Sequence, residues 1–82
     1  MAKQMSNLNK YDNVFMEIFG VHAEELAALT FRSMAQWDSV GHMRLMADIE
    51  SKFDVMLDTE DIVGFSSYKK GKEILIKYGV EI

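Results

Sequence analysis

Apolar residues recur at intervals of three and four positions along separate stretches of this 82-residue chain, and no stretch alternates clearly between polar and apolar residues. The first pattern places side chains on one face of an α-helix, whereas alternation is typical of a half-buried strand. No proline interrupts the helical stretches. The sequence therefore predicts an all-α fold.

The periodic stretches predict three main helices and one short helix, each bounded by a capping residue or a glycine. They span Asn7–Phe19, ended by Gly20; Ser39–Phe53; a short piece around Thr59–Val63; and a last segment that follows Ser66 or Ser67 and ends at Gly79. Asp58 and Asp61 resemble a loose capping box for the short helix. Because a chain of this length forms one domain, we predict a small four-helix bundle over residues 1–82.

A long loop separates the first two predicted helices. Leu26, Leu29 and Met34 are expected to anchor it, with a turn or two of helix inside it. Connections between helices usually take only about 2–8 residues, and longer loops often carry function. We expect Trp37 to close the end of this loop against the bundle; the alternative is an exposed place at a partner interface.

The predicted helix over residues 39–53 has the clearest pattern. Its apolar side is expected to comprise Val40, Met43, Met46 or Ala47, Ile49 or Glu50, and Phe53. Asp38 precedes the helix, and its carboxylate is placed to accept a free backbone N–H group as an N-cap. Methionines are adaptable apolar side chains, so Met43 and Met46 are candidates for lining a pocket or contacting partners.

Charge and composition exclude several classes of function. Nine basic residues stand against thirteen acidic ones, a formal charge of −4, which disfavours a nucleic-acid partner. The absence of cysteine excludes disulfides, thiolate zinc sites and thiol nucleophiles. The first ten residues contain no apolar run resembling a signal peptide, and nowhere do about 20 apolar residues stand together. We expect a cytoplasmic monomer that does not insert into a membrane.

Ser39, His42 and Asp38 supply the residue types of a hydrolytic triad, but their spacing argues against one. A triad requires a third group that orients the base. Asp38 is adjacent to Ser39 and is placed to bond the backbone instead of His42. We therefore predict that the domain is not an enzyme.

Metal sites are also disfavoured by spacing. The possible ligands are His22, Glu24, Glu25 and His42 for a transition metal, and Asp54, Asp58 and Asp61 for calcium. The two histidines show no recognised ligand spacing, and the three aspartates lack the alternating ligands and central glycine of a calcium loop. We interpret the aspartates as a solvated turn.

Ser39 has two interpretations from its position alone. It is either an ordinary first-turn serine behind the Asp38 cap or a hydroxyl that carries a phosphate ester. A helix N-terminus has unpaired N–H groups and partial positive charge, which favour a phosphate. Composition and spacing leave both interpretations open.

The segment DSVGHMRLMADIESKFDVML resembles the second-helix signature of the acyl carrier proteins. Asp38-Ser39-Val40 matches the attachment motif, Leu45 and Ile49 the apolar helix positions, Glu50 the acid, and Phe53 the closing aromatic residue. The resemblance extends over nearly the whole chain through the long preceding loop, the short acidic helix and the last helix.

The resemblance implies a carrier that holds acyl groups as thioesters on a 4′-phosphopantetheine arm attached to Ser39. A separate, magnesium-dependent phosphopantetheinyl transferase would install the arm. A cognate acyl-loading ligase or synthase, together with acyltransferases, would use it in lipid, secondary-metabolite or surface-saccharide biosynthesis. In the family, a shallow apolar space flanked by the long loop and the last helix receives the acyl chain.

Candidates for partner or acyl-pocket contacts are Val40, Met43, Arg44, Met46, Glu50 and Ile62. Arg44 stands where fatty-acid carriers typically have an acid, Gly41 and His42 replace polar or acidic residues, and Lys52 adds positive charge. Residues 38–53 consequently carry a net charge of only −1. A specialised carrier is therefore expected. The alternatives are an aminoacyl or peptidyl carrier, although the sequence Gly-Gly-His-Ser of peptidyl carriers is absent, and an unmodified protein-interaction module of the same fold.

Overall fold

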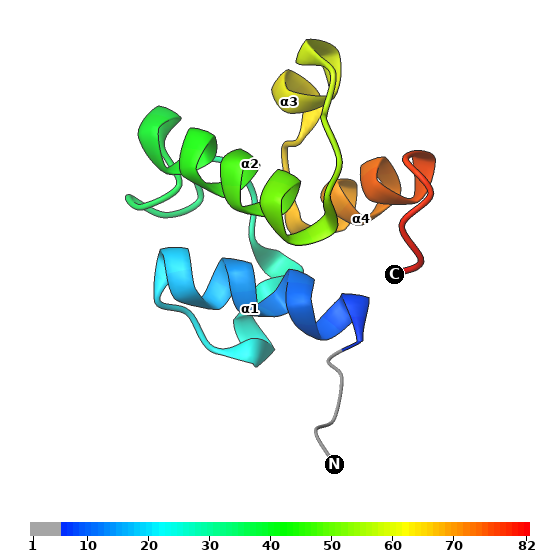
Figure 1. Cartoon of the computed structure of the whole chain (residues 1–82). Helices are drawn as coiled ribbons and strands as arrows, with labels where there is room; N and C mark the ends of the chain where they lie inside the picture. The colour runs from blue at the N-terminus through cyan, green and yellow to red at the C-terminus, as the bar shows by residue number, and fades with distance from the viewer. Residues whose placement is uncertain (1–5) are drawn as a thin grey trace.

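The computed structural model, which describes residues 6–82, confirms the all-α prediction (Figure 1). Its helices are α1 (Asn7–Phe19), the 3-10 helix η1 (Ala23–Ala28), α2 (Ser39–Phe53), α3 (Thr59–Gly64) and α4 (Tyr68–Lys77). Residues 6–82 form no strand, and one isolated bridge pairs Thr30 with Ser67. The residues before Ser6, part of the stretch without a signal-peptide pattern, lie outside the described residues.

Capping side chains set the helix boundaries that the sequence predicts. The Ser6 hydroxyl accepts the Asn9 N–H at 3.1 Å at the start of α1, and Gly20 ends that helix with a φ of 66°. Ser67, one of the two candidate caps, accepts the Lys70 N–H at 2.9 Å at the start of α4. The predicted bounds of α1 and α2 are confirmed, and α3 is one residue longer than expected.

The long loop contains the expected turn or two of helix, in the form of η1. The His22 N–H donates to the Glu25 carboxylate at 3.0 Å at the start of this 3-10 helix. Leu26 and Leu29 are buried and Met34 packs against the edge of the core, so the predicted anchors are confirmed. The loop then reaches α2 through Trp37.

An aromatic core lies between α1, the end of the long loop, and α4. Phe15 stands at its centre, with its ring in contact with the rings of Tyr11, Phe19, Trp37, Phe65 and Tyr68. Trp37 is fully buried, which confirms that it closes the loop against the bundle. A Cβ at Gly71 of α4 would lie 2.1 Å from the Phe65 ring, so only glycine leaves space for this packing.

The side of α2 that faces the core differs from the side predicted from its apolar residues. Val40 and Met43 are 69% and 57% exposed, so the prediction that they mark the buried side is wrong. The buried residues of α2 are Gly41, Leu45, Met46 and Ile49. Consecutive helical residues are about 100° apart around the axis. Gly41, Leu45 and Ile49, which are spaced by four positions, therefore share one side of α2, and Val40 points away from that side.

Helix α3 begins without the predicted capping box. Asp58 precedes it but makes no side-chain cap hydrogen bond within the described chain. Asp61 turns instead toward α4, where it accepts hydrogen bonds from Lys77 and Tyr78, each at 2.6 Å. Asp61 is only 9% exposed, so its interpretation as part of a solvated turn is also wrong.

Helices α1 and α2 form a packed pair, and the short helix α3 lies apart from this pair. In Figure 1, α1 and α2 lie against each other and run in opposite directions, while α3 stands at the far side of α2 from α1. None of the helices in residues 6–82 combines the length and the apolar character that crossing a membrane requires.

Candidate functional site around Ser39

Ser39 is the first residue of α2, and it is exposed. The residue before it, Asp38, caps the helix as predicted, because its carboxylate accepts the Gly41 N–H at 2.8 Å. The Asp38 carbonyl accepts the His42 N–H at 2.8 Å, which closes the first helical turn. Asp38 therefore bonds the backbone, and Ser39 is presented to solvent from a fixed turn.

The end of the long loop presses against this first turn. A Cβ at Gly41 would lie 1.9 Å from the Gln36 carbonyl oxygen and 3.4 Å from the Phe19 ring. A side chain at position 41 would therefore push Gln36 and Trp37 away from α2. Steric contact with the loop therefore explains why position 41 is glycine in this chain instead of a polar or acidic residue.

His42 joins the loop, α2 and α3 through its two ring nitrogens. The Trp37 indole N–H donates to His42 Nδ1 at 3.0 Å, and His42 Nε2 lies 2.7 Å from the Ile62 carbonyl oxygen. Because a carbonyl oxygen only accepts, the Nε2-protonated neutral ring satisfies both bonds. Neither nitrogen is left to accept a proton from Ser39, so this geometry does not form a nucleophile–base pair.

An apolar cavity of about 230 Å³ lies one helical turn from Ser39. Its lining residues come from the loop, α2, α3 and the α3–α4 connection: Phe31, His42, Ile62, Val63, Phe65 and Ser66. The rings of Phe31 and Phe65 meet the His42 ring edge to face, at centroid distances of 5.3 and 6.3 Å. The walls are thus mainly apolar and aromatic.

This cavity is not the space expected between the long loop and the last helix. The long loop contributes to the wall as expected, through Phe31, whereas α3 supplies the opposite wall and no residue of α4 lines the cavity. Ile62 was a predicted pocket residue and lies in the wall. Sequence analysis missed Phe31, Val63, Phe65 and Ser66 because they belong to no common helical period. The one sequence signal for this wall was that Phe31 and Phe65 are isolated aromatic residues in connecting segments.

The remaining candidate residues lie outside the cavity wall. Val40, Met43 and Arg44 are exposed on α2, and Met46 is 1% exposed in the core. Glu50 is half-buried, and its carboxylate accepts the Leu57 N–H at 2.8 Å. Glu50 therefore orders the connector that leads to α3, and the exposed residues form a separate face of α2.

Two polar links hold α3 in place over the cavity. One is the contact between His42 and the Ile62 carbonyl, and the other is the Asp61 carboxylate with Lys77 and Tyr78. Hydrogen bonds from Lys77 and Tyr78 hold the pKa of Asp61 below its ordinary value of 3.8. The carboxylate is therefore ionised at neutral pH and binds its two partners in that form.

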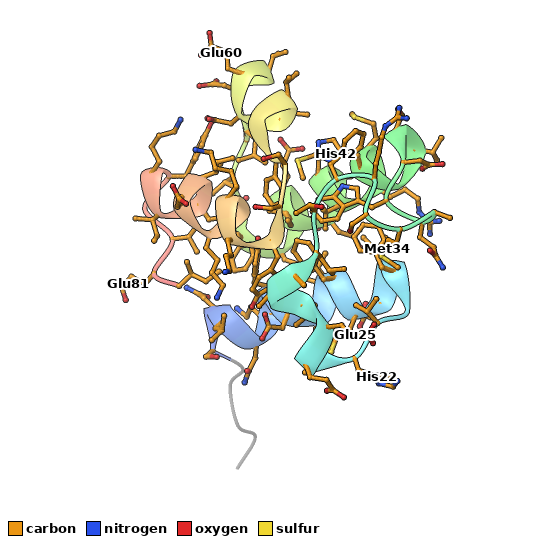
Figure 2. All side chains as sticks on the ribbon, turned by 180° about the vertical axis from the view of Figure 1, so that it is seen from behind. His22, Glu25, Met34, His42, Glu60 and Glu81 are labelled. Carbon is orange, nitrogen blue, oxygen red and sulfur yellow. The ribbon has the colours of Figure 1, made fainter. Side chains whose placement is uncertain are left out.

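The two histidines considered as metal ligands lie far apart. Figure 2 shows His22 beside η1 and His42 on α2, separated by much of the molecule. Among residues 6–82, no three side chains of histidine, aspartate or glutamate are grouped so as to hold a metal ion.

The fold and site define a small helical domain with an exposed serine at a helix start, next to an apolar cavity. Comparisons of the chain with protein-family models, with curated proteins and with solved structures find no match.

Proposed function

We propose that this chain is an acyl carrier protein whose Ser39 bears a 4′-phosphopantetheine arm. The resemblance of residues 38–57 to the second-helix signature supports this proposal. The structural observation that carries it is an exposed Ser39 at the first position of α2, one turn from an apolar cavity. A carrier needs both an accessible attachment point and a place that shields its cargo from water.

The residues around Ser39 fit a phosphodiester. The first turn of α2 retains backbone N–H groups near the serine, and its partial positive charge favours an anion. Asp38 already bonds the Gly41 N–H, so its carboxylate is drawn toward the backbone. When attached, the arm supplies the thiol that forms the thioester, a group that this cysteine-free chain lacks.

In this proposal the domain carries and presents its cargo, and separate enzymes do the chemistry. With both nitrogens of His42 engaged, activation of the Ser39 hydroxyl falls to the phosphopantetheinyl transferase. A cognate ligase or synthase loads the acyl group, and acyltransferases remove it. The chain's own part is to hold Ser39 in a fixed turn and to offer the cargo an apolar surface that includes Phe31 and Ile62.

The exposed face of α2 favours a specialised partner. It presents Val40 and Met43 together with Arg44, Asp48 and Lys52, two cations against one anion. A partner with a purely basic contact surface would meet repulsion here, whereas one with an acid opposite Arg44 would associate faster. Arg44→Glu should therefore improve acceptance by enzymes of fatty-acid synthesis and impair the cognate enzyme, as measured by acylation rates. Unchanged rates in both assays would make Arg44 an ordinary solvated charge.

The attachment is tested by mass. The chain is coexpressed with a broad-specificity phosphopantetheinyl transferase, and the intact mass is measured beside that of Ser39→Ala. We expect one arm on the wild-type chain and none on the variant. Ser51→Ala, which changes another exposed serine of α2, is the matched control and should be modified normally. An unmodified wild-type chain contradicts the proposal.

A second candidate is an unmodified protein-interaction module of the same fold. The exposed Val40 and Met43 favour it, since an apolar strip on a helix suits a partner protein. Such a module would bind its partner equally well as Ser39→Ala, whereas a carrier's enzymes would distinguish the apo, modified and Ser39→Ala forms. Binding measurements on these three forms separate the candidates.

A further inference from the structure

The geometry points to a cargo class: the partly open cavity near Ser39 accepts a neutral acyl tail about the size of one aromatic ring and leaves most of a long straight chain in water. The delivery of this tail on an arm rests on the proposed function. The size and shape preference rests on the cavity alone, and it therefore applies equally to small free molecules.

Volume sets the size of the occupant. The cavity measures about 230 Å³. For comparison, an engineered cavity of about 150 Å³ with apolar walls binds benzene, and sites for drug-sized ligands measure about 300–1,000 Å³. There is space for one ring and a few further carbon atoms. A long fatty acyl chain would leave most of its length in water.

The packing behind the cavity prevents it from extending inward. His42 forms part of the wall, and the Trp37 ring stacks behind it at a centroid distance of 6.3 Å and an interplanar angle of 16°. Trp37 and Phe65 are both fully buried. A longer tail would have to displace these rings from a close-packed core.

The shape of the walls favours a ring over a flexible chain. Phe31 and His42, which are both partly exposed, supply the aromatic surface of the wall, and the buried Phe65 ring packs edge to face against His42. Aromatic rings prefer these tilted arrangements. A rigid ring also loses less rotational freedom on entry than an alkyl chain with several rotatable bonds.

The lining disfavours charged tails. None of the lining residues is a carboxylate, a lysine or an arginine, and both nitrogens of His42 already have partners. An ammonium or carboxylate entering this space would lose its hydration without gaining a counter-ion. An aminoacyl tail is therefore a poorer occupant than a neutral arylacyl tail, which separates this cargo class from that of the aminoacyl carriers.

The cavity is tested first on the unmodified chain. Toluene, cyclohexane and n-octane are titrated separately at equal free concentrations, while NMR follows the methyl groups of Ile62 and Val63. We expect saturable shifts with toluene, binding roughly two- to tenfold weaker for cyclohexane, and no saturation with n-octane. Equal or tighter binding of n-octane, or no saturable shift with toluene, overturns the inference.

Three variants keep this test independent of folding failures. Ile62→Phe fills the cavity and should abolish the toluene shifts at Val63, whereas Met43→Phe adds the same ring at an exposed position and should leave them unchanged. Ile62→Ala enlarges the space and should bind naphthalene more tightly than the wild type does. If toluene shifts persist in Ile62→Phe, or if Ile62→Ala binds as the wild type does, the assigned site is wrong.

The loaded form is tested with stable amide analogues of phenylacetyl- and palmitoyl-coenzyme A, transferred to Ser39 and verified by mass. The phenylacetyl tail should reproduce the toluene shifts at Ile62 and Val63, and the palmitoyl tail should not. A chain that accepts no arm but binds toluene contradicts the proposed function and leaves the cavity preference intact. A chain that accepts both arms without shifts from phenylacetyl contradicts the preference alone.

Discussion

The aromatic core around α1 and the short helix α3 are held in place by different forces. Phe15 lies in contact with five other rings and is fully buried, as are its neighbours Tyr11 and Trp37. Helix α3 has six residues, and Val63 within it is 78% exposed. Its position depends on His42, on Asp61 and on the apolar residues at its two ends, Leu57 and Phe65.

This difference separates a rigid part of the molecule from an adjustable one. Close-packed aromatic side chains resist any change of volume, because each moves only if its neighbours move. A short helix held by a few hydrogen bonds opens at a lower free energy than the core does. In the proposed carrier, the rigid part fixes Ser39 and the adjustable part forms one wall of the cavity.

The largest contrast is expected between truncations in the two regions. Phe15→Ala should lower the free energy of unfolding by about 3–5 kcal/mol, because it removes a fully buried ring and leaves a cavity. Val63→Ala should change it by no more than about 0.5 kcal/mol, since that side chain is exposed. Urea unfolding followed by circular dichroism measures both. Similar costs for the two variants would remove the distinction between the regions.

Two glycines provide a sharper comparison. Gly41→Ala should destabilise the fold by about 1–3 kcal/mol, because the added Cβ meets the Gln36 carbonyl at 1.9 Å. For Gly64 in α3, no described atom lies within 4 Å of the Cβ position. Gly64→Ala should be neutral or stabilising by up to about 1 kcal/mol. Thermal unfolding monitored by Trp37 fluorescence distinguishes the two, and destabilisation by Gly64→Ala would contradict the open environment.

His42→Leu tests the link between the regions. The buried Trp37 N–H and the Ile62 carbonyl would both lose their partner, at a cost of about 1–3 kcal/mol. Amide hydrogen exchange should accelerate in α3 more than in α1. His22→Leu, at an exposed position that makes no such link, is the control. Equal acceleration in both helices would mean that His42 supports the whole fold instead of anchoring α3.

The smallest effect concerns pH and the anchor of α3 on α4. The pKa of Asp61 is lower in the folded chain than its ordinary value of 3.8, so the ionised carboxylate stabilises the fold above that pH. This contribution is lost as the pH falls through the lower folded value. Below about pH 4, the unfolding free energy of Asp61→Asn should therefore fall less steeply than that of the wild type. Asp48→Asn, an exposed acid of α2, should keep the wild-type slope. Identical slopes for wild type and Asp61→Asn would show that this anchor contributes nothing.

The sequence predicted the bounds of the helices better than it predicted which side of each helix is buried. The bounds of α1 and α2 followed from caps such as Asp38 and from apolar spacing, both of which are local properties. The buried side of α2 was misassigned because it includes Gly41, which carries no hydrophobic signal, while the apolar Val40 and Met43 face solvent. Burial depends on what packs against a helix, and the period of a single helix does not contain that information.

Local chemistry along the chain determined the helices, the Asp38 cap and the position of Ser39 at a helix start, because hydrogen bonds within a turn join neighbours in sequence. Only the tertiary structure decided the cavity and the anchoring of α3. Phe31, His42 and Ile62 come from three separate segments, and Asp61 reaches its partner Lys77 sixteen residues later. Such contacts form only after the segments have packed together, since their geometry depends on the volume of every side chain between them.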